Sequence, residues 1–189
     1  NMWDYLRNVI KEFPEEITGT LSTPASDHLF KVREDGRKLS EELADAFHHT
    51  VYQLLFAANR ARRDIQTAVS FLTTRVKAPA DEDDWGKLVR VLKYINGTRY
   101  MKLILNADEM NFTVHWYVDG SHQCHEDCRG QIGCLMMMGK GAVISSSNIM
   151  KCNTRSSTEM ELISVHDNCL ILYGRDTLSN VKGTIKMST

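Results

Sequence analysis

The feature that most constrains this chain is a change in the spacing of its apolar residues after residue 98. Before this point apolar side chains recur every three or four positions, which is typical of amphipathic helices. After it they alternate with polar side chains, most clearly over 112–119, and this period of two indicates a half-buried strand. The sequence therefore predicts a mixed α/β chain, with a helical segment over 1–98 and a sheet-forming segment over 99–189.

Local signals place the elements within each segment. The first segment contains four predicted helices, over 2–13, 39–58, 65–76 and 85–95. Their ends are indicated by a closing proline, a capping aspartate, an acidic run and an Asn-Gly pair. In the second, β-type patterns predict strands over 101–105, 112–119, 131–138 and 142–147. A helix is predicted from 157 to 173. The last fifteen residues show no strong period, and we expect them to fray.

Composition narrows the class of protein without naming a function. The length of 189 residues suits one domain or two half-domains. The formal charge of -1 means that the chain as a whole has no excess of positive charge to attract nucleic acid. Any nucleic-acid binding must then rest on local patches. Five cysteines without a regular spacing fit a reducing compartment, and no apolar run is long enough to span a membrane. The chain begins with Asn rather than Met and lacks a signal peptide, so we expect a piece of a longer protein.

Two carboxylates are the strongest candidates for chemistry. Asp119 ends the alternating strand on the face opposite its apolar residues, and Glu161 lies early in the late helix. Mg²⁺ prefers oxygen ligands and shares them with phosphate, so carboxylates held on a strand end and a helix suit a metal-dependent phosphodiester hydrolase. The structural alternative is that Asp119 opens a turn with Gly120 and Glu161 forms a capping box with Thr158. Spacing alone favours that alternative.

Short motifs occur in a fixed order along almost the whole chain. They include Phe71-Leu72-Thr73-Thr74-Arg75-Val76, Val118-Asp119-Gly120-Ser121 and Ser156-Ser157-Thr158-Glu159-Met160-Glu161-Leu162, with further matches at 12–15, 23–30, 62–68, 85–90, 94–98, 129–133, 139–141 and 153–155. In this order they resemble the polyprotein of copia-type retrotransposons, from the end of the reverse transcriptase through the connection into RNase H. The resemblance covers roughly residues 2–175.

The resemblance implies an activity, a cofactor and partners. In the family, the strand Asp and the helix Glu are RNase H metal ligands, which assigns Asp119 and Glu161 as catalytic residues binding Mg²⁺. The implied reaction is hydrolysis of the RNA strand of an RNA–DNA hybrid during retrotransposon replication. The implied partners are that hybrid or a template-primer duplex, and the upstream reverse transcriptase domain of the same polyprotein. The implied location is a virus-like particle in the cytoplasm, from which the protein can enter the nucleus.

The chain also departs from the family pattern. The family has a further strand, after the late helix, that carries a third catalytic aspartate, and no such strand is evident here. Arg63 replaces a proline, and Ile149-Met150 replaces a Lys-Gln pair. We therefore expect a truncated RNase H-like fold of three antiparallel strands plus a helix, from a truncated, decayed or misread copy. The strand over 112–119 would have an open edge, and activity would be weak or absent.

Two non-enzymatic functions remain open alongside the nuclease. One is a non-catalytic module that grips a nucleic-acid duplex through the helices before residue 98. Basic residues near the third helix, Arg60, Arg62 and Arg63, could follow its phosphates, although a solvated helix face accounts for them equally well. The other is an inert remnant of a retroelement with no selected role.

Two further patterns could suggest other sites. Cys124, His125 and Cys128, with His122 nearby, approach a zinc ligand set, but the fourth ligand is missing at a plausible spacing, so chance clustering in a loop is favoured. The segment 117–120 superficially resembles the reverse-transcriptase polymerase hairpin. It has one aspartate instead of two, so we reject a polymerase site there.

Overall fold

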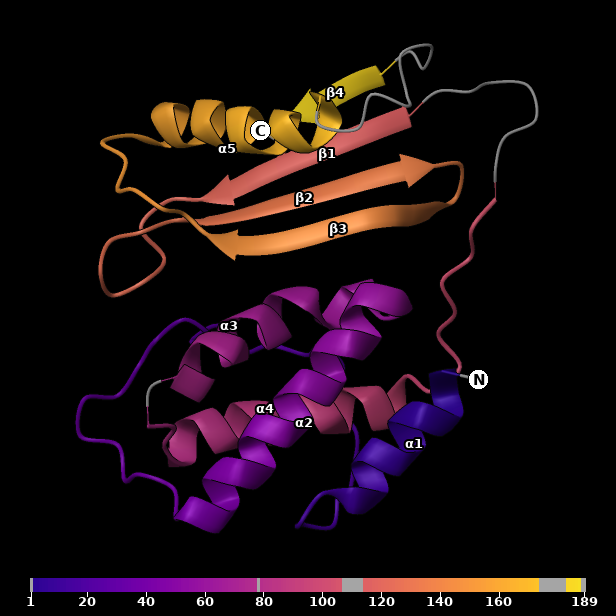
Figure 1. Ribbon diagram of the computed structural model, residues 1–189, viewed down its shortest axis with the longest axis vertical. Helices are drawn as coiled ribbons and strands as arrows, with labels where there is room; N and C mark the ends of the chain where they lie inside the picture. Colours follow the sequence, from indigo (N-terminus) through magenta and orange to yellow (C-terminus); the bar gives the residue numbers. More distant parts are fainter. Residues whose placement is uncertain (1, 78, 107–113, 174–182, 188–189) are drawn as a thin grey trace. The chain divides into compact units, whose positions relative to one another are not determined.

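The computed structural model describes residues 2–77, 79–106, 114–173 and 183–187 (Figure 1). The chain divides into two compact units, Asn1–Lys102 and Leu103–Thr189. The sequence prediction had placed the boundary after residue 98. The first unit is helical and the second contains a sheet, so the chain is mixed α/β.

The first unit is built from amphipathic helices, as the apolar spacing predicts. Its elements are α1 (Met2–Glu12), α2 (Glu41–Arg60), the short 3₁₀ helix η1 (Arg63–Ile65), α3 (Gln66–Lys77) and α4 (Glu82–Gly97). α2 packs on both α1 and α3, and α4 packs on α3. The four predicted helices are confirmed, and α4 begins three residues earlier than its apolar stripe because the acidic run forms its first turn.

Side-chain caps fix where two of these helices begin. The Ser40 hydroxyl accepts the Leu43 N–H (3.4 Å) at the start of α2. At α4, the Asp81 carboxylate accepts the N–H groups of Asp83 and Asp84, each at 3.0 Å, and the Asp84 carboxylate accepts the Asp81 N–H in return. This reciprocal capping box satisfies backbone donors that the first helical turn leaves unpaired.

Apolar side chains of the helices meet in one continuous core. Leu54, Leu72, Leu88 and Leu92 are fully buried at its centre. The Phe13 and Trp85 rings stack with their centroids 4.8 Å apart. Burial of such side chains contributes about 1.5–3 kcal/mol each, so this core is the main source of stability in the first unit.

The second unit contains a four-stranded sheet crossed by one helix. Its elements are β1 (Val114–Ser121), β2 (Gln131–Met138), β3 (Gly141–Ile149), α5 (Ser157–Tyr173) and β4 (Gly183–Met187). β1 pairs with β2 and β2 with β3, both antiparallel, while β4 pairs parallel to β1, which gives the order β3-β2-β1-β4. The three predicted antiparallel strands and the late helix are confirmed.

Three sequence predictions for this unit are wrong. The sheet has a fourth strand, β4, within the last fifteen residues, where fraying was expected; residues 174–182 and 188–189 lie outside the described part of the chain. β1 lies between β2 and β4, so it has no open edge. Residues 101–105 do not form a strand, and Ile104 and Leu105 are exposed instead.

α5 packs along β1 on one face of the sheet (Figure 1). Val165 of α5 contacts the cluster formed by Val114, Trp116 and Val118, the apolar face of β1. A Cβ atom at Gly120 would lie 2.9 Å from both Met160 Cε and Ser164 Oγ, so a glycine is what allows the helix this close to the strand end. Among the described helices, none is long and apolar enough to cross a membrane.

Candidate functional site

Asp119 lies near the end of the central strand with its side chain exposed. The neighbouring residues Val118 and Gly120 belong to the face under α5, so strand alternation turns Asp119 toward the other face, as the sequence predicted. Its Oδ1 accepts the Gly120 N–H at 2.8 Å. The turn-type hydrogen bond of the structural alternative is therefore present, but it engages only one carboxylate oxygen.

A row of residues extends from Asp119 across the face of the sheet opposite α5. Strand register places Asp119 opposite Gly133 on β2, and Gly133 opposite Ser147 on β3. A Cβ at Gly133 would meet only the Asp119 carbonyl oxygen, at 3.8 Å. The Gln131 amide donates to Ser147 Oγ (2.8 Å), and Gln131 Oε1 lies 2.9 Å from His125 Nε2. The carboxylate thus lies in the same row as a neutral polar network.

Glu161 lies on the side of α5 that turns toward the sheet. Residues spaced by three, four and seven positions share a helix face, so Glu161 is aligned with Ser164, Val165 and Asn168. Ser164 and Asn168 are buried and Val165 packs on the strand cluster, whereas Glu161 is half-buried one turn before them. The helix therefore directs this carboxylate toward the rim of the sheet.

The capping residues of α5 differ from those considered in the sequence. The Ser156 hydroxyl accepts the Glu159 N–H (3.2 Å), and Glu159 Oε2 accepts the Arg155 N–H (2.7 Å). The pair at the helix start is therefore Ser156 and Glu159, not Thr158 and Glu161. Glu161 is not committed to capping, which removes the structural alternative for this residue.

The residues next to the two candidate carboxylates lie close together, although the Asp119 side chain is turned to the face away from α5. Gly120, which follows Asp119, lies under Met160, which precedes Glu161. Two carboxylates on a strand end and an early helical turn are hard oxygen donors of the kind that Mg²⁺ prefers. In the described part of the chain, no group of three or more His, Cys, Asp or Glu is arranged to hold a metal ion.

The three arginines predicted to contact a duplex lie in different environments. Arg62 is only 3% exposed; its guanidinium forms an ion pair with Asp64 (2.7 Å) and donates to Thr98 Oγ1 (2.6 Å). It therefore holds the helices together and is not presented to a phosphate backbone. Arg63 is half-buried, and burial lowers the pKa of its guanidinium. Arg60 is exposed, with its guanidinium 5.0 Å from the centre of the Phe56 ring.

The cysteine- and histidine-rich loop does not form a metal site among the described residues. His122 Nε2 lies 3.1 Å from the Thr154 carbonyl oxygen, and His125 contacts Gln131. Burial raises the pKa of the Cys124 thiol. Cys128 is exposed. The interpretation of chance clustering in a loop stays a prediction.

Sequence inspection missed the polar network of His125, Gln131 and Ser147. Gln131 was assigned only to a strand, and the loop histidine was considered only as a zinc ligand. The signal that could have found the network is the polar residue Gln131 at the start of an otherwise apolar strand, because a buried amide requires hydrogen-bond partners.

Comparison with known proteins finds no match to this chain. No protein-family model, curated protein or solved structure matches the chain. The assignment of function therefore rests on the residues and their geometry.

Proposed function

We propose that this chain is the connection and RNase H portion of a copia-type retrotransposon polyprotein, with Asp119 and Glu161 as its metal-binding carboxylates. The parent activity is Mg²⁺-dependent hydrolysis of RNA in RNA–DNA hybrids. The substrate is the hybrid, and the upstream reverse transcriptase domain is the neighbour that would deliver it. The site of action is the virus-like particle.

The observation that carries this proposal is the contact of Gly120 with Met160. It brings the strand end that bears Asp119 next to the helical turn that bears Glu161, while the Asp119 side chain points to the face away from α5. The pairing of β4 beside β1 adds support, because the complete RNase H fold is expected to place further strands there. The sequence of β4, Gly183–Met187, contains no Asp or Glu, so a third carboxylate does not come from this strand.

The chain's own residues would act by positioning charge. When bound, Mg²⁺ activates water and stabilises the leaving oxygen of a phosphodiester. The Gly120 N–H donates a hydrogen bond to one oxygen of Asp119, which fixes the direction of this carboxylate. With two protein carboxylates, we expect slow cleavage.

The test is cleavage of a labelled RNA–DNA hybrid by excess protein in Mg²⁺. Loss of cleavage in both Asp119→Asn and Glu161→Gln, with Glu126→Gln as an exposed control from the same unit, supports the proposal. Cleavage that survives both substitutions contradicts it. Binding without cleavage, unchanged by Asp119→Asn, would favour the duplex-binding module, and a failure to bind or cut would favour an inert remnant.

A further inference from the structure

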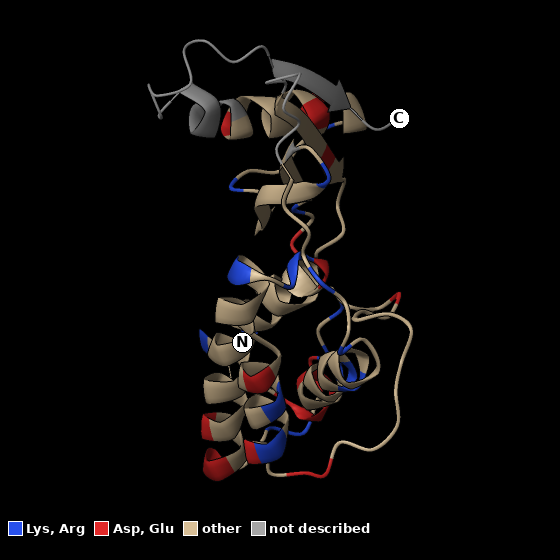
Figure 2. Cartoon of the chain, turned by 90° about the vertical axis from the view of Figure 1, so that its right-hand side faces the viewer, with Lys and Arg blue, Asp and Glu red and all other residues tan. Residues whose placement is uncertain are grey.

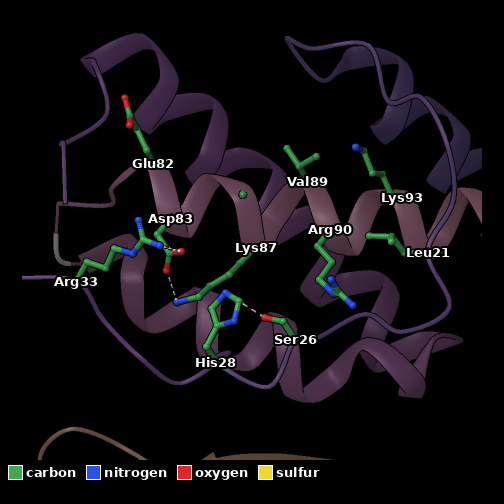
Figure 3. Close-up of a pocket in the computed structure, with 11 residues that line it drawn as sticks. Leu21, Ser26, His28, Arg33, Glu82, Asp83, Lys87, Val89, Arg90 and Lys93 are labelled. Atoms are coloured by element: carbon green, nitrogen blue, oxygen red, sulfur yellow. Dashed lines mark hydrogen bonds and ion pairs between the residues drawn. The ribbon is translucent and has the colours of Figure 1, made fainter.

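The charged side chains of the helical unit are paired along α4, whereas those on the exposed face of α2 are not. In the cavity beside α4, Asp83 Oδ2 lies 2.9 Å from Lys87 Nζ, and Asp83 Oδ1 lies 3.7 Å from Arg33 Nη2 (Figure 3). On α2, Asp45 and Arg60 are exposed, and neither forms an ion pair within the described part of the chain. The exposed face of α2 therefore retains charges that a partner could pair.

Aromatic rings occupy the middle of this face. Tyr52 is 47% exposed and Phe56 is 46% exposed, although large apolar side chains are usually buried. The ring centroids of His48 and Tyr52 are 4.9 Å apart, and the Arg60 guanidinium lies 5.0 Å from the centre of the Phe56 ring. Tyr5 of α1 also lies against Phe56, with the ring centroids 5.4 Å apart. Rings that neighbouring groups already hold in place lose little conformational entropy on binding, so they favour an interface.

The exposed residues of α2 form a stripe whose charge reverses from one end to the other. The stripe consists of Asp45, His49, Tyr52, Phe56 and Arg60, all of which are exposed. Each follows the one before it by three or four positions, the spacing of neighbours on one face of a helix. The acid lies at the first end of the stripe, the base lies at the last end, and the rings lie between them.

We propose that this stripe is an interface between two copies of the chain, with their α2 helices antiparallel. A two-fold interface uses the same patch on both copies, so the patch must be complementary to itself. The stripe meets this condition: when the pair is centred between residues 52 and 53, Asp45 of each copy lies opposite Arg60 of the other. The same register places His49 opposite Phe56 and leaves Tyr52 beside the two-fold axis. The interface does not use the candidate carboxylates, so it stands or falls independently of the nuclease proposal.

The size of the stripe sets the expected strength of the dimer. One face of a single helix buries less surface than the roughly 800 Å² per partner of a standard interface. We therefore expect a weak dimer, in exchange with the monomer at micromolar concentration. The opposite charges at its two ends fix the antiparallel register, because a parallel pair would place like charges opposite one another.

The test exchanges the charges at the two ends of the stripe. Asp45→Arg alone and Arg60→Glu alone each place like charges opposite one another in the dimer, so we expect the dissociation constant to rise roughly tenfold or more. The double variant Asp45→Arg/Arg60→Glu restores opposite charges, as does an equimolar mixture of the two single variants, and both should dimerise as the parent does. The two positions are about 22 Å apart along one helix, so this recovery cannot arise within a single copy.

Sedimentation equilibrium of the full chain measures the dissociation constants, and circular dichroism checks that each variant is folded. Asp27→Arg, which makes the same change of charge at an exposed residue outside α2, is the control and should dimerise as the parent does. The proposal is overturned if the parent stays monomeric at submillimolar concentration or if the single variants dimerise as tightly as the parent. It is equally overturned if the charge exchange does not restore the dimer.

Discussion

The helical unit and the sheet unit bury different kinds of polar residue. In the helical unit the buried polar residues include charged ones, Arg62, Asp81, Asp84 and Lys87. In the described part of the sheet unit they are neutral: Gln131, Ser147, Thr154, Ser164 and Asn168. Buried charges therefore hold helices together in the first unit, whereas Asp119 of the second unit is exposed. Acidic and basic residues are interspersed along the helices, and the strands carry few of either (Figure 2).

The substitution that we expect to lower stability most, and so to test this comparison, is at Arg75. Its Nε lies 3.0 Å from Asp84 Oδ2, and the Asp84 side chain is 2% exposed. Arg75→Gln would leave this carboxylate buried without its cation, which costs roughly 3 kcal/mol of unfolding free energy. Arg37→Gln, which removes the exposed partner of Glu82, is the control and should change stability by less than about 1 kcal/mol. Urea denaturation measures both, and equal effects would break the comparison.

The second prediction concerns how the Arg62–Asp64 pair affects the stability of the folded protein in acid. Burial raises the pKa of Asp64, but the hydrogen bonds and charge of Arg62 outweigh it, so the folded-state pKa is below its usual value. A lowered carboxyl pKa contributes stability that is present above the unfolded pKa and is lost as the pH falls through the folded value. We expect Arg62→Gln to flatten the loss of stability below pH 4. Denaturation from pH 7 to pH 3 measures this slope, and an unchanged slope would contradict the assignment.

A third effect tests the packing that joins the candidate carboxylates. Gly120→Ala would bring a Cβ within 2.9 Å of Met160 Cε and Ser164 Oγ, so these side chains of α5 must shift. We expect a loss of about 1–2 kcal/mol in thermal or urea unfolding. Gly133→Ala is the matched control on the neighbouring strand, because its Cβ meets only Asp119 O at 3.8 Å. Equal stability of the two variants would show that α5 does not lie so close to β1.

The smallest effect separates the two possible caps of α5. Ser156→Ala removes the acceptor of the Glu159 N–H and should cost about 1 kcal/mol. Thr158→Ala should be close to neutral, since Thr158 is exposed on the first turn. Thermal unfolding of the two variants gives the comparison. A larger loss in Thr158→Ala would restore the capping role of Glu161 and weaken its assignment as a ligand.

Sequence patterns predicted most elements because their signals are local. The apolar spacing of the four helices and the alternation of β1 depend on neighbouring residues, and both appear in the structure. β4 was missed because it has five residues and is defined by parallel pairing with β1, a non-local contact. Residues 101–105 have a strand-like composition, but strand formation also requires a partner.

The candidate site was predictable only in part. Asp119 could be placed on the non-apolar face by alternation, but two overlapping Ser/Thr-x-x-Glu patterns compete at the start of α5, and only the helix boundary at Ser157 selects Ser156. Arg62 was assigned to a surface because arginine is usually exposed. Its burial depends on Asp64 and Thr98, and the second of these is distant in sequence.

The central claim is that Asp119 and Glu161 share one divalent ion. The most direct measurement is Mn²⁺ titration followed by NMR, since Mn²⁺ accepts the same oxygen ligands as Mg²⁺ and broadens signals of nearby nuclei. The account predicts selective broadening of the Gly120 and Leu162 amide signals, lost in Asp119→Asn and in Glu161→Gln but retained in Glu126→Gln. Broadening that is absent from these amides, or that persists in both site variants, would contradict it.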